Sequence, residues 1–357
     1  MYNLIKNKIP RHLIHSLKDR DFFVSFLQTL YRVSFDAPVV NMHINSECNY
    51  GCTYCYSKKK ASRKTDWMRV LDDCNKLNVR EVQFLGGEPL LDKDIRRYLK
   101  KCEEFGMNVI LFTNGILINK RFITFIKNLK IEVRLAIKFD TPECHERDIS
   151  GNTQDYKKLI KIIRNCTDNG INVLGHVTVS KHNFQMIPDL INTANKLNII
   201  LTFERYIPVH RCIGLELNSE EWCMALKTIS DFYTSKDKYY LAHSVIRGNT
   251  CNCCMDLLSI DVDGYVKPCP FSAIEESLGN VNTQTLPEIW RLFQEKREEW
   301  LKIPDDCREC KSKLICHGGC RTYTFIHKKK YNAKDPLCNG EIIPTLGWCG
   351  FGVKNHE

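Results

Sequence analysis

Short apolar runs alternate with longer amphipathic stretches from about residue 39 onward. Each run is rich in Val, Ile, Leu and Phe, which is typical of strands buried in a parallel sheet. The predicted strands are Val39–Ile44, Glu81–Leu85, Asn108–Thr113, Ile131–Phe139, Asn172–Val179 and Ile199–Tyr206. Stretches with helical length and periodicity follow them, near residues 65–77, 92–105, 119–129, 154–168, 184–197 and 219–235.

Six β-α units in succession predict an α/β fold, in which helices cover a parallel sheet curved into a partial (β/α)6 TIM-like barrel. Functional side chains of such a sheet are expected at the carboxyl ends of its strands. The alternation stops near residue 239, where cysteine, glycine and proline become frequent. We therefore predict a barrel domain over residues 39–238 and a small cysteine-rich domain over residues 239–357, preceded by a helical extension over residues 1–38.

The N-terminal extension contains a basic amphipathic segment at residues 11–33. A helix that caps one end of the barrel is the simpler interpretation, and a helix that binds a membrane surface or a partner is the alternative. The extension has neither an uninterrupted apolar core nor a small-residue cleavage site, so it does not resemble a secretory signal.

Composition and charge exclude several classes of protein. With 43% hydrophobic and 26% charged residues, the 357-residue chain has ordinary globular composition, which excludes collagen-like, low-complexity and wholly disordered proteins. No apolar window is long enough for a membrane span. The net charge of +10 favours acidic partners, but it is spread along the chain. No stacking or groove-binding motif accompanies it, so nucleic acid is not an expected partner.

Cysteine is the unusual component, with 19 residues. In a large chain without an export signal, so many cysteines favour a reducing compartment and metal-bound thiolates over disulfides. We therefore expect a cytoplasmic protein that binds metal through cysteine.

Three cysteines follow the first predicted strand closely, in the pattern Cys48-x3-Cys52-x2-Cys55. A tetrahedral zinc site needs four ligands, and no fourth cysteine or histidine lies nearby in the sequence. Three thiolates suit an iron–sulfur cubane in which one iron stays open for a substrate. A structural zinc ion with a distant fourth ligand is the alternative.

This spacing at the end of a first strand resembles that of the radical S-adenosylmethionine (SAM) enzymes. The resemblance implies that Cys48, Cys52 and Cys55 bind a four-iron, four-sulfur (4Fe-4S) cluster, whose open iron is chelated by SAM. An electron from the cluster would cleave SAM to methionine and a 5′-deoxyadenosyl radical, which takes a hydrogen atom from the substrate. Tyr56 stands at the aromatic position that lies near the adenine in this family.

Further SAM-binding residues are implied at the ends of the next strands. Paired glycines allow close approach of a ligand to the backbone, and the run after the second strand resembles the GGEP motif that binds the SAM amino group. Asn114 belongs to a Thr-Asn-Gly run that resembles the family's TNG element, although a simple turn explains it as well. The residues of the GGEP run are Gly86, Gly87, Glu88 and Pro89.

The fourth strand departs from the family pattern, because Lys138 and its neighbours replace the usual Ser-Leu-Asp-Gly run. Lys138 is the candidate partner of the SAM carboxylate, since a cation there can pair with it. The alternative is that Lys138 only pairs with Asp140 or Glu132. Glu204 and Arg205, at the end of the sixth strand, are expected to face SAM or substrate or to pair with each other.

A second set of cysteines occupies the C-terminal part of the chain. Cys251-x12-Gly264-x4-Cys269 is followed by Cys307-x2-Cys310-x5-Cys316-x3-Cys320 and then by Cys338. This order and spacing resemble the SPASM extension of radical SAM enzymes. One or two structural zinc knuckles are the alternative, because zinc also uses Cys-x2-Cys pairs.

The resemblance implies two auxiliary 4Fe-4S clusters. The first would be bound by Cys251, Cys269 and Cys320, with Cys254 as our choice for the fourth ligand and Cys253 as its rival. The second would be bound by Cys307, Cys310, Cys316 and Cys338. With the SAM-binding cluster, the expected cofactors are three 4Fe-4S clusters and SAM.

Two auxiliary clusters make sense if an electron must leave the product radical or if substrate binds to one of them. Either role of the auxiliary clusters favours net oxidation of the substrate. SPASM enzymes most often act on ribosomally made peptides or protein side chains. We therefore expect a peptide-modifying oxidoreductase that forms a crosslink or thioether or dehydrogenates its substrate, supplied by a reductant such as flavodoxin or ferredoxin. The alternative substrate is a small molecule such as a tetrapyrrole, an aminocyclitol or a cofactor precursor. A non-catalytic electron carrier would not explain the open-site cluster motif.

Overall fold

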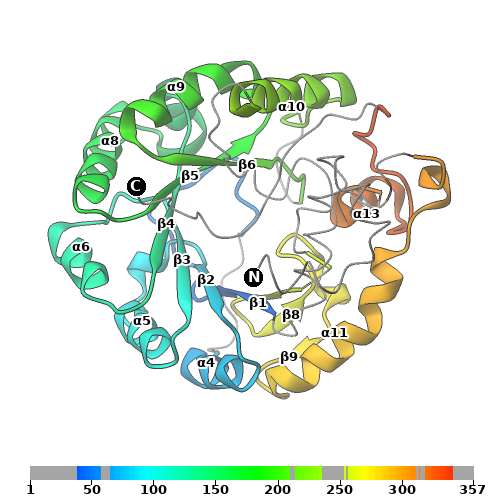
Figure 1. Ribbon diagram of the computed structural model, residues 1–357, viewed down its shortest axis with the longest axis horizontal. Helices are drawn as coiled ribbons and strands as arrows, with labels where there is room; N and C mark the ends of the chain where they lie inside the picture. The colour runs from blue at the N-terminus through cyan, green and yellow to red at the C-terminus, as the bar shows by residue number, and fades with distance from the viewer. Residues whose placement is uncertain are drawn as a thin grey trace, which may run out of the picture. The chain divides into compact units, whose positions relative to one another are not determined.

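The six predicted strands are present and lie side by side in chain order. In the computed structural model, which describes residues 38–57, 65–209, 214–234, 253–254, 256–310, 313 and 318–340, each pairs in parallel with the next. The sheet is curved but not closed, which confirms the partial barrel (Figure 1). The strands are β1 (Val39–His43), β2 (Glu81–Leu85), β3 (Asn108–Thr113), β4 (Val133–Lys138), β5 (Val173–Val179) and β6 (Ile200–Arg205).

Helices cover the outer face of these strands, as Figure 1 shows. Their apolar faces pack on the sheet; in α5, for example, Leu99 and Cys102 are buried while Lys100 is only partly covered on the opposite side. Side-chain caps begin several of them; Asp66, Asn119 and Asn152, for example, accept hydrogen bonds from backbone N–H groups of the first turn. The helices are α4 (Trp67–Lys76), α5 (Ile95–Glu104), α6 (Lys120–Lys127), α8 (Thr153–Asp168), α9 (Ile187–Leu197) and α10 (Ser219–Thr234).

Short helices occupy several loops that follow the strands. After β4 the chain forms one turn of α-helix and then a π-helix, which is uncommon and is frequent at functional sites. The short elements are η1 (Pro89–Leu91), α7 (Pro142–Cys144), the π-helix η2 (His145–Ser150) and η3 (Phe184–Met186).

The cysteine-rich part of the chain extends the same sheet. β7 (Leu257–Ile260) pairs in parallel with β1, and β8 (Tyr265–Lys267) and β9 (Gly279–Asn280) follow in antiparallel order. These strands were not predicted. The remaining elements are η4 (Ile274–Glu276), α11 (Leu286–Leu301), η5 (Asp305–Cys307) and α13 (Arg321–Lys328).

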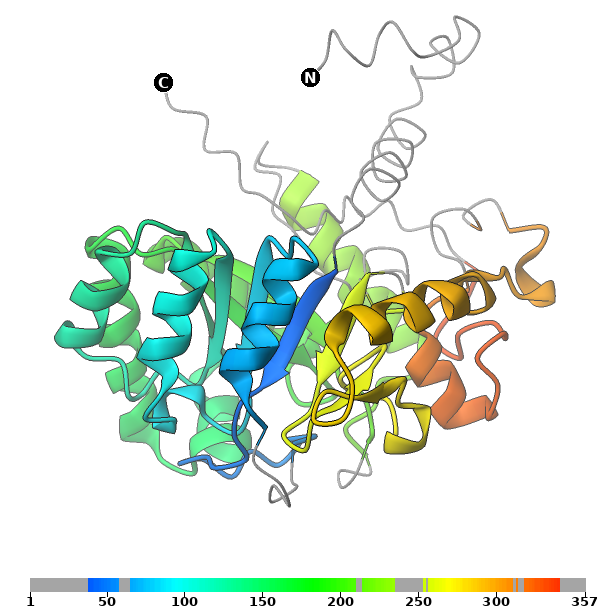
Figure 2. The same ribbon diagram turned by 90° about the horizontal axis from the view of Figure 1, so that it is seen from below.

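α11 continues the outer helical layer beside α4 (Figure 2). The backbone N–H of Leu286 at its start donates to Asp73 Oδ2 of α4 over 3.1 Å, and Lys76 of α4 holds the same carboxylate at 2.8 Å. The described residues all belong to one compact unit, Ala37–Glu357. The domain boundary near residue 239 stays a prediction, because residues 235–252 lie outside the described ranges, as does the helix expected at 11–33. No helix in the described ranges is long and apolar enough to cross a membrane.

Candidate active site

A cavity of about 370 Å³ lies among the strands and the cysteine-rich loops. Inward-facing residues of β2 to β6 line one part of it, and cysteines of both sets line another. The structure therefore brings together most of the predicted site that falls within the described residues. The predicted residues on its wall are Cys48, Cys52, Cys55, Tyr56, Gly86, Gly87, Asn114, Lys138, Cys269, Cys310, Cys320 and Cys338.

The first cysteine motif forms a loop directly after β1, and its three thiols are free. Burial is the main cause that raises the pKa of Cys52, to about 12, and burial also raises the pKa of Cys48. Cys48 Sγ accepts a hydrogen bond from the Tyr50 backbone N–H at 3.4 Å. A bound metal deprotonates such thiols outright, so free thiols converging on a cavity fit a metal cluster.

The π-helix η2 and helix α8, which follow β4, hold this loop by hydrogen bonds to residues 50–53. The Thr53 N–H donates to the Asp148 carbonyl at 2.9 Å, and the Cys52 thiol lies 3.8 Å from the Ile149 carbonyl. The Tyr50 hydroxyl donates to Asp155 of α8 at 3.0 Å. The π-helix η2 and the start of α8 thus fix the geometry of the cysteine loop.

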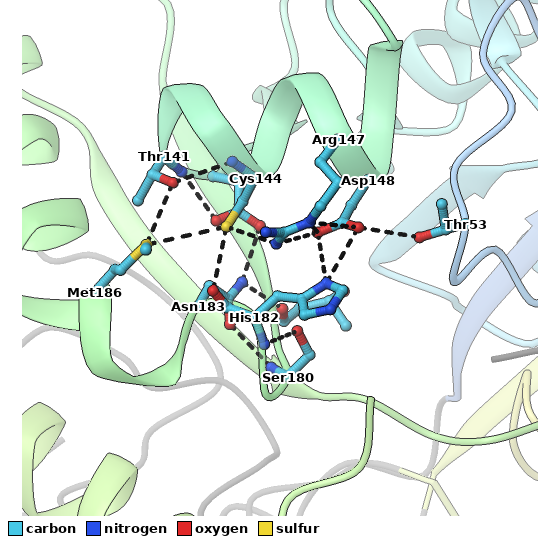
Figure 3. A network of polar contacts seen from close by, with 11 residues as sticks. Thr53, Thr141, Cys144, Arg147, Asp148, Ser180, His182, Asn183 and Met186 are labelled. Atoms are coloured by element: carbon cyan, nitrogen blue, oxygen red, sulfur yellow. Dashed lines mark hydrogen bonds and ion pairs between the residues drawn. The ribbon is translucent and has the colours of Figure 1, made fainter. Parts of the chain in front are cut away.

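Asp148 is the centre of this bracing network, which Figure 3 shows. Its buried carboxylate accepts from Arg147 Nη2 at 2.8 Å and from His182 Nδ1 at 3.0 Å, and the Thr53 hydroxyl lies 3.5 Å away. Burial opposes ionisation, but Arg147 and His182 outweigh it and hold the pKa of Asp148 below its usual value. Arg147 also donates to Cys144 Sγ at 3.2 Å. Sequence reasoning missed this network, because its members are dispersed and match no motif.

The GGEP run packs against the backbone of Ser46 and Glu47, just before the cysteine loop. A Cβ on Gly87 would lie 2.1 Å from the Glu47 carbonyl oxygen, so only glycine fits there. Glu88 is buried and accepts from Thr113 Oγ1 at 2.7 Å and from the Asn114 N–H at 2.8 Å. Glu88 and Pro89 do not line the cavity, so the glycines are the members of the motif that can reach a ligand.

Asn114 connects the end of β3 to the cysteine loop. Its Nδ2 donates to Asn49 Oδ1 at 2.8 Å, and its side chain also hydrogen-bonds Cys48. Asn114 is therefore more than a turn residue, because it touches the loop and the cavity together.

Lys138 reaches into the cavity from the end of β4. Its Nζ donates to Thr178 Oγ1 at 2.5 Å and lies 4.7 Å from the centre of the Tyr54 ring. Asp140 and Glu132 are engaged elsewhere: Asp140 accepts from Asn183 Nδ2 at 2.9 Å, and Glu132 accepts from an asparagine of the next loop. Burial lowers the pKa of Lys138, and the Cys52 thiol is the strongest group that opposes this.

Two polar residues of the cavity wall were not singled out as a pair from the sequence. His176 Nε2 of β5 lies 3.1 Å from Glu204 Oε2 of β6. His176 Nδ1 is 3.2 Å from Thr202 Oγ1. Alternation along β5 and β6 would have revealed that these side chains face inward.

In the second cysteine set, Cys253 lines the cavity and hydrogen-bonds the Cys269 side chain, whereas Cys254 is buried and is not part of the wall. Cys307 lies beside Cys310 in η5 and the following turn, and it is within electrostatic reach of Cys338. Cys251 and Cys316 lie outside the described residues.

A hairpin explains the glycine of this motif. Asp261 Oδ1 accepts from the backbone N–H groups of Asp263 and Tyr265, both at 3.0 Å, and closes the turn between β7 and β8. Gly264 adopts φ +87°, a region that favours glycine, and a Cβ there would lie 2.5 Å from Asn282 Nδ2. The hairpin places Cys269 directly after β8.

An aromatic contact joins the two cysteine sets across the cavity. The rings of Tyr56, next to Cys55, and Phe271, close to Cys269, have centroids 4.6 Å apart. Within the described ranges, no three His, Cys, Asp or Glu side chains approach closely enough to share a single metal ion. The thiols are instead distributed around the cavity wall.

Comparison with known families decides the class of the protein. Residues 42–194 match the model of the radical SAM superfamily, and residues 248–311 match that of the SPASM iron–sulfur cluster-binding domain. The chain belongs to the radical SAM superfamily and carries a SPASM domain. Membership implies that it binds SAM and iron–sulfur clusters.

Relatives within this superfamily differ in what they act on. The chain is 24% identical to a PqqA peptide cyclase of Granulibacter bethesdensis, with 83% of this chain and 85% of the relative covered. It is 22% identical to an Fe-coproporphyrin III synthase of Methanosarcina barkeri, with 94% and 92% covered. The fold is similar to that of Streptococcus suis SuiB, with a TM-score of 0.68, 18% identity and 85% and 78% of the chains covered. SuiB has also been solved with its precursor peptide SuiA.

Proposed function

We propose that this radical SAM enzyme oxidises a ribosomally made peptide or a protein side chain. The observation that carries the proposal is that thiols of both cysteine sets line the same cavity. A substrate held there lies between the site of radical formation and a second redox site.

Residues of the barrel would hold the first cofactor pair. Cys48, Cys52 and Cys55 would bind the 4Fe-4S cluster, and the backbone of Gly86 and Gly87 would receive the SAM amino group. Lys138, partly buried and facing the cavity, would neutralise the SAM carboxylate, since a carboxylate removed from water needs a cationic partner. Bound there, the cluster and SAM supply a 5′-deoxyadenosyl radical that abstracts hydrogen.

The second cysteine set would hold two auxiliary clusters, which makes three 4Fe-4S clusters in all. Cys269, Cys320 and Cys251 would bind the first, and Cys253 is favoured over Cys254 as the fourth ligand because it lines the cavity beside Cys269. Cys307, Cys310, Cys316 and Cys338 would bind the second.

A substrate that loses two hydrogens is oxidised by two electrons, and each hydrogen needs a destination. Loss of two hydrogens sends one hydrogen atom to the deoxyadenosyl group, and the remaining electron and proton must leave separately. His176 and Glu204 stand on the wall of the cavity, where one can accept that proton. An auxiliary cluster held by the second cysteine set on the same cavity would give the electron a destination, with an external flavodoxin or ferredoxin as the reductant for SAM cleavage.

The similar proteins support two different classes of substrate. The PqqA peptide cyclase and the SuiA-bound SuiB support a peptide. The Fe-coproporphyrin III synthase, which aligns over nearly the whole chain, and an AdoMet-dependent heme synthase of Nitratidesulfovibrio vulgaris support a tetrapyrrole side chain as the second candidate.

The test offers both substrate classes to the reconstituted enzyme with SAM and a reductant. One set of samples receives candidate precursor peptides, and the other receives a panel of porphyrins that includes Fe-coproporphyrin III. We expect 5′-deoxyadenosine formation coupled to a peptide mass lower by two hydrogens for each bond formed. Coupled turnover of the porphyrin with an unchanged peptide would overturn the peptide proposal and favour the second candidate.

A further inference from the structure

A buried ion pair joins the end of the barrel to the auxiliary cysteines. Arg205, the last residue of β6, and Asp335 are only 6% and 7% exposed. Arg205 Nη2 donates to Asp335 Oδ2 at 2.7 Å, and Nη1 lies 3.3 Å from Oδ1. This two-pronged contact fixes the guanidinium plane. Arg205 and Glu204 both line the cavity, as one of the two expectations for them has it, and they pair with Asp335 and His176 respectively.

The Asp335 carboxylate also organises the backbone around two auxiliary cysteines. Oδ2 accepts from the Cys320 N–H at 2.8 Å, and Oδ1 accepts from the Leu337 N–H at 2.9 Å. The Asp335 carbonyl accepts from the Cys338 N–H at 3.0 Å. A Cβ on Gly319 would lie 2.3 Å from Asp335 Cβ, so the loop leaves no space between them. Asp335 thus holds residues that are assigned to different auxiliary clusters.

Arg205 makes a third contact, to sulfur. While two of its nitrogens face Asp335, the guanidinium also hydrogen-bonds the Cys320 side chain. Its other face lies on the Tyr323 ring, 4.4 Å from the centroid. A guanidinium has five donors in a rigid plane and stays charged in proteins. It can therefore serve Asp335 and Cys320 at the same time.

We propose that Arg205 sets the reduction potential of the auxiliary cluster that Cys320 ligates, and that it raises this potential. Reduction adds negative charge to an iron–sulfur cluster, and a cation with an N–H directed at a ligating sulfur stabilises the reduced form. Asp335 cancels part of the charge and holds the donor in place. The proposal rests on the proposed function, in which this cluster receives an electron from the substrate side.

Arginine is needed here, because lysine cannot replace both contacts. A lysine carries a single ammonium point, which can pair with Asp335 or approach Cys320 but cannot form the planar fork. Arg205→Gln removes the charge, and Arg205→Lys keeps the charge and removes the fork. Together these variants separate the contribution of charge from that of the directed hydrogen bond.

The experiment is an anaerobic redox titration of the intact, reconstituted enzyme, followed by electron paramagnetic resonance. In Arg205→Gln, the reduction equilibrium of one auxiliary cluster should shift about tenfold or more toward the oxidised form, which is about 59 mV for a one-electron couple. Arg205→Lys should shift it in the same direction by a smaller amount. The SAM-binding cluster and the second auxiliary cluster serve as internal references and should keep their potentials.

A matched control removes an arginine ion pair that is partly buried. Arg134 of β4 pairs with Glu81 of β2 away from the cavity, and Arg134→Gln should leave all cluster potentials unchanged. Parental potentials in a fully loaded Arg205→Gln variant would overturn the proposal. If that variant fails to fold, parental potentials in Arg205→Lys would overturn the part of the proposal that assigns the shift to the directed hydrogen bond. If the parent enzyme holds only about four irons, one cubane's content, the auxiliary clusters themselves are absent, and the proposed function fails with this inference.

Discussion

The two cysteine sets face one cavity but are built in opposite ways. The first set spans eight residues of a single loop, Cys48–Cys55, and neighbouring barrel elements brace it from outside. The second set is dispersed over the sequence between Cys251 and Cys338. Among its described members, a hairpin positions Cys269 and the Asp335 carboxylate holds the backbone of Cys320. A compact ligand loop can therefore be recognised from its spacing, whereas a dispersed set depends on long-range contacts.

This difference predicts that each side can be damaged without the other. The largest effect is expected for Asp148→Ala, which removes the centre of the network behind the first loop. The variant leaves Arg147 and His182, whose side chains are 48% and 37% exposed, without their carboxylate. Because water reaches both, each lost contact costs at most about 1 kcal/mol. We expect the SAM-binding cluster to be lost on desalting, while the auxiliary clusters stay, as measured by iron content and electron paramagnetic resonance.

The control for this variant is Asp189→Ala, which removes an exposed carboxylate of the adjacent helix α9. It should retain all clusters. Equal loss of iron from both sides in Asp148→Ala would show that the network supports the whole fold rather than the loop, and full retention would show that the loop needs no brace.

A smaller effect is expected for Lys138→Ala, which leaves the loop in place and changes only its SAM-facing wall. A hydrogen bond to a charged group contributes about 1.5–3 kcal/mol, so SAM binding should weaken about tenfold or more. Equilibrium dialysis with labelled SAM measures this. Lys93→Ala, an exposed lysine just before α5, is the control. Equal affinities of the two variants, with equal iron content, would remove Lys138 from the site.

The barrel could be predicted almost residue by residue, because its strands are local apolar runs. β2 and β3 begin and end at the predicted residues, and β4 is shorter by a few residues. β7 escaped prediction, because its four residues have no helix after them and their partner β1 lies more than two hundred residues earlier. Parallel pairing over such a separation leaves no periodic signal in the sequence.

In the site, too, features encoded by local motifs could be predicted and features that depend on long-range contacts could not. The family resemblance predicted that the first cysteines, the paired glycines, Asn114 and Lys138 share a SAM site, and these residues line one cavity. Spacing could not show that Glu88 does not line it, because two of the three donors to its carboxylate, Thr113 Oγ1 and the Asn114 N–H, come from the end of β3. Nor could spacing show which of the adjacent residues Cys253 and Cys254 lines the cavity. That depends on the local backbone conformation, in which Cys254 adopts φ +62°.

The central claim is that two independent thiol sets serve one cavity, the first for radical formation and the second for electron transfer. The most direct test measures iron, sulfide and zinc per chain, together with 5′-deoxyadenosine, in the parent and in a variant with Cys48, Cys52 and Cys55 all changed to Ala. We predict about 12 irons with SAM cleavage in the parent and about 8 irons without it in the variant, four for each cubane. About 4 irons with bound zinc in the parent, or undiminished 5′-deoxyadenosine in the variant, would contradict the account.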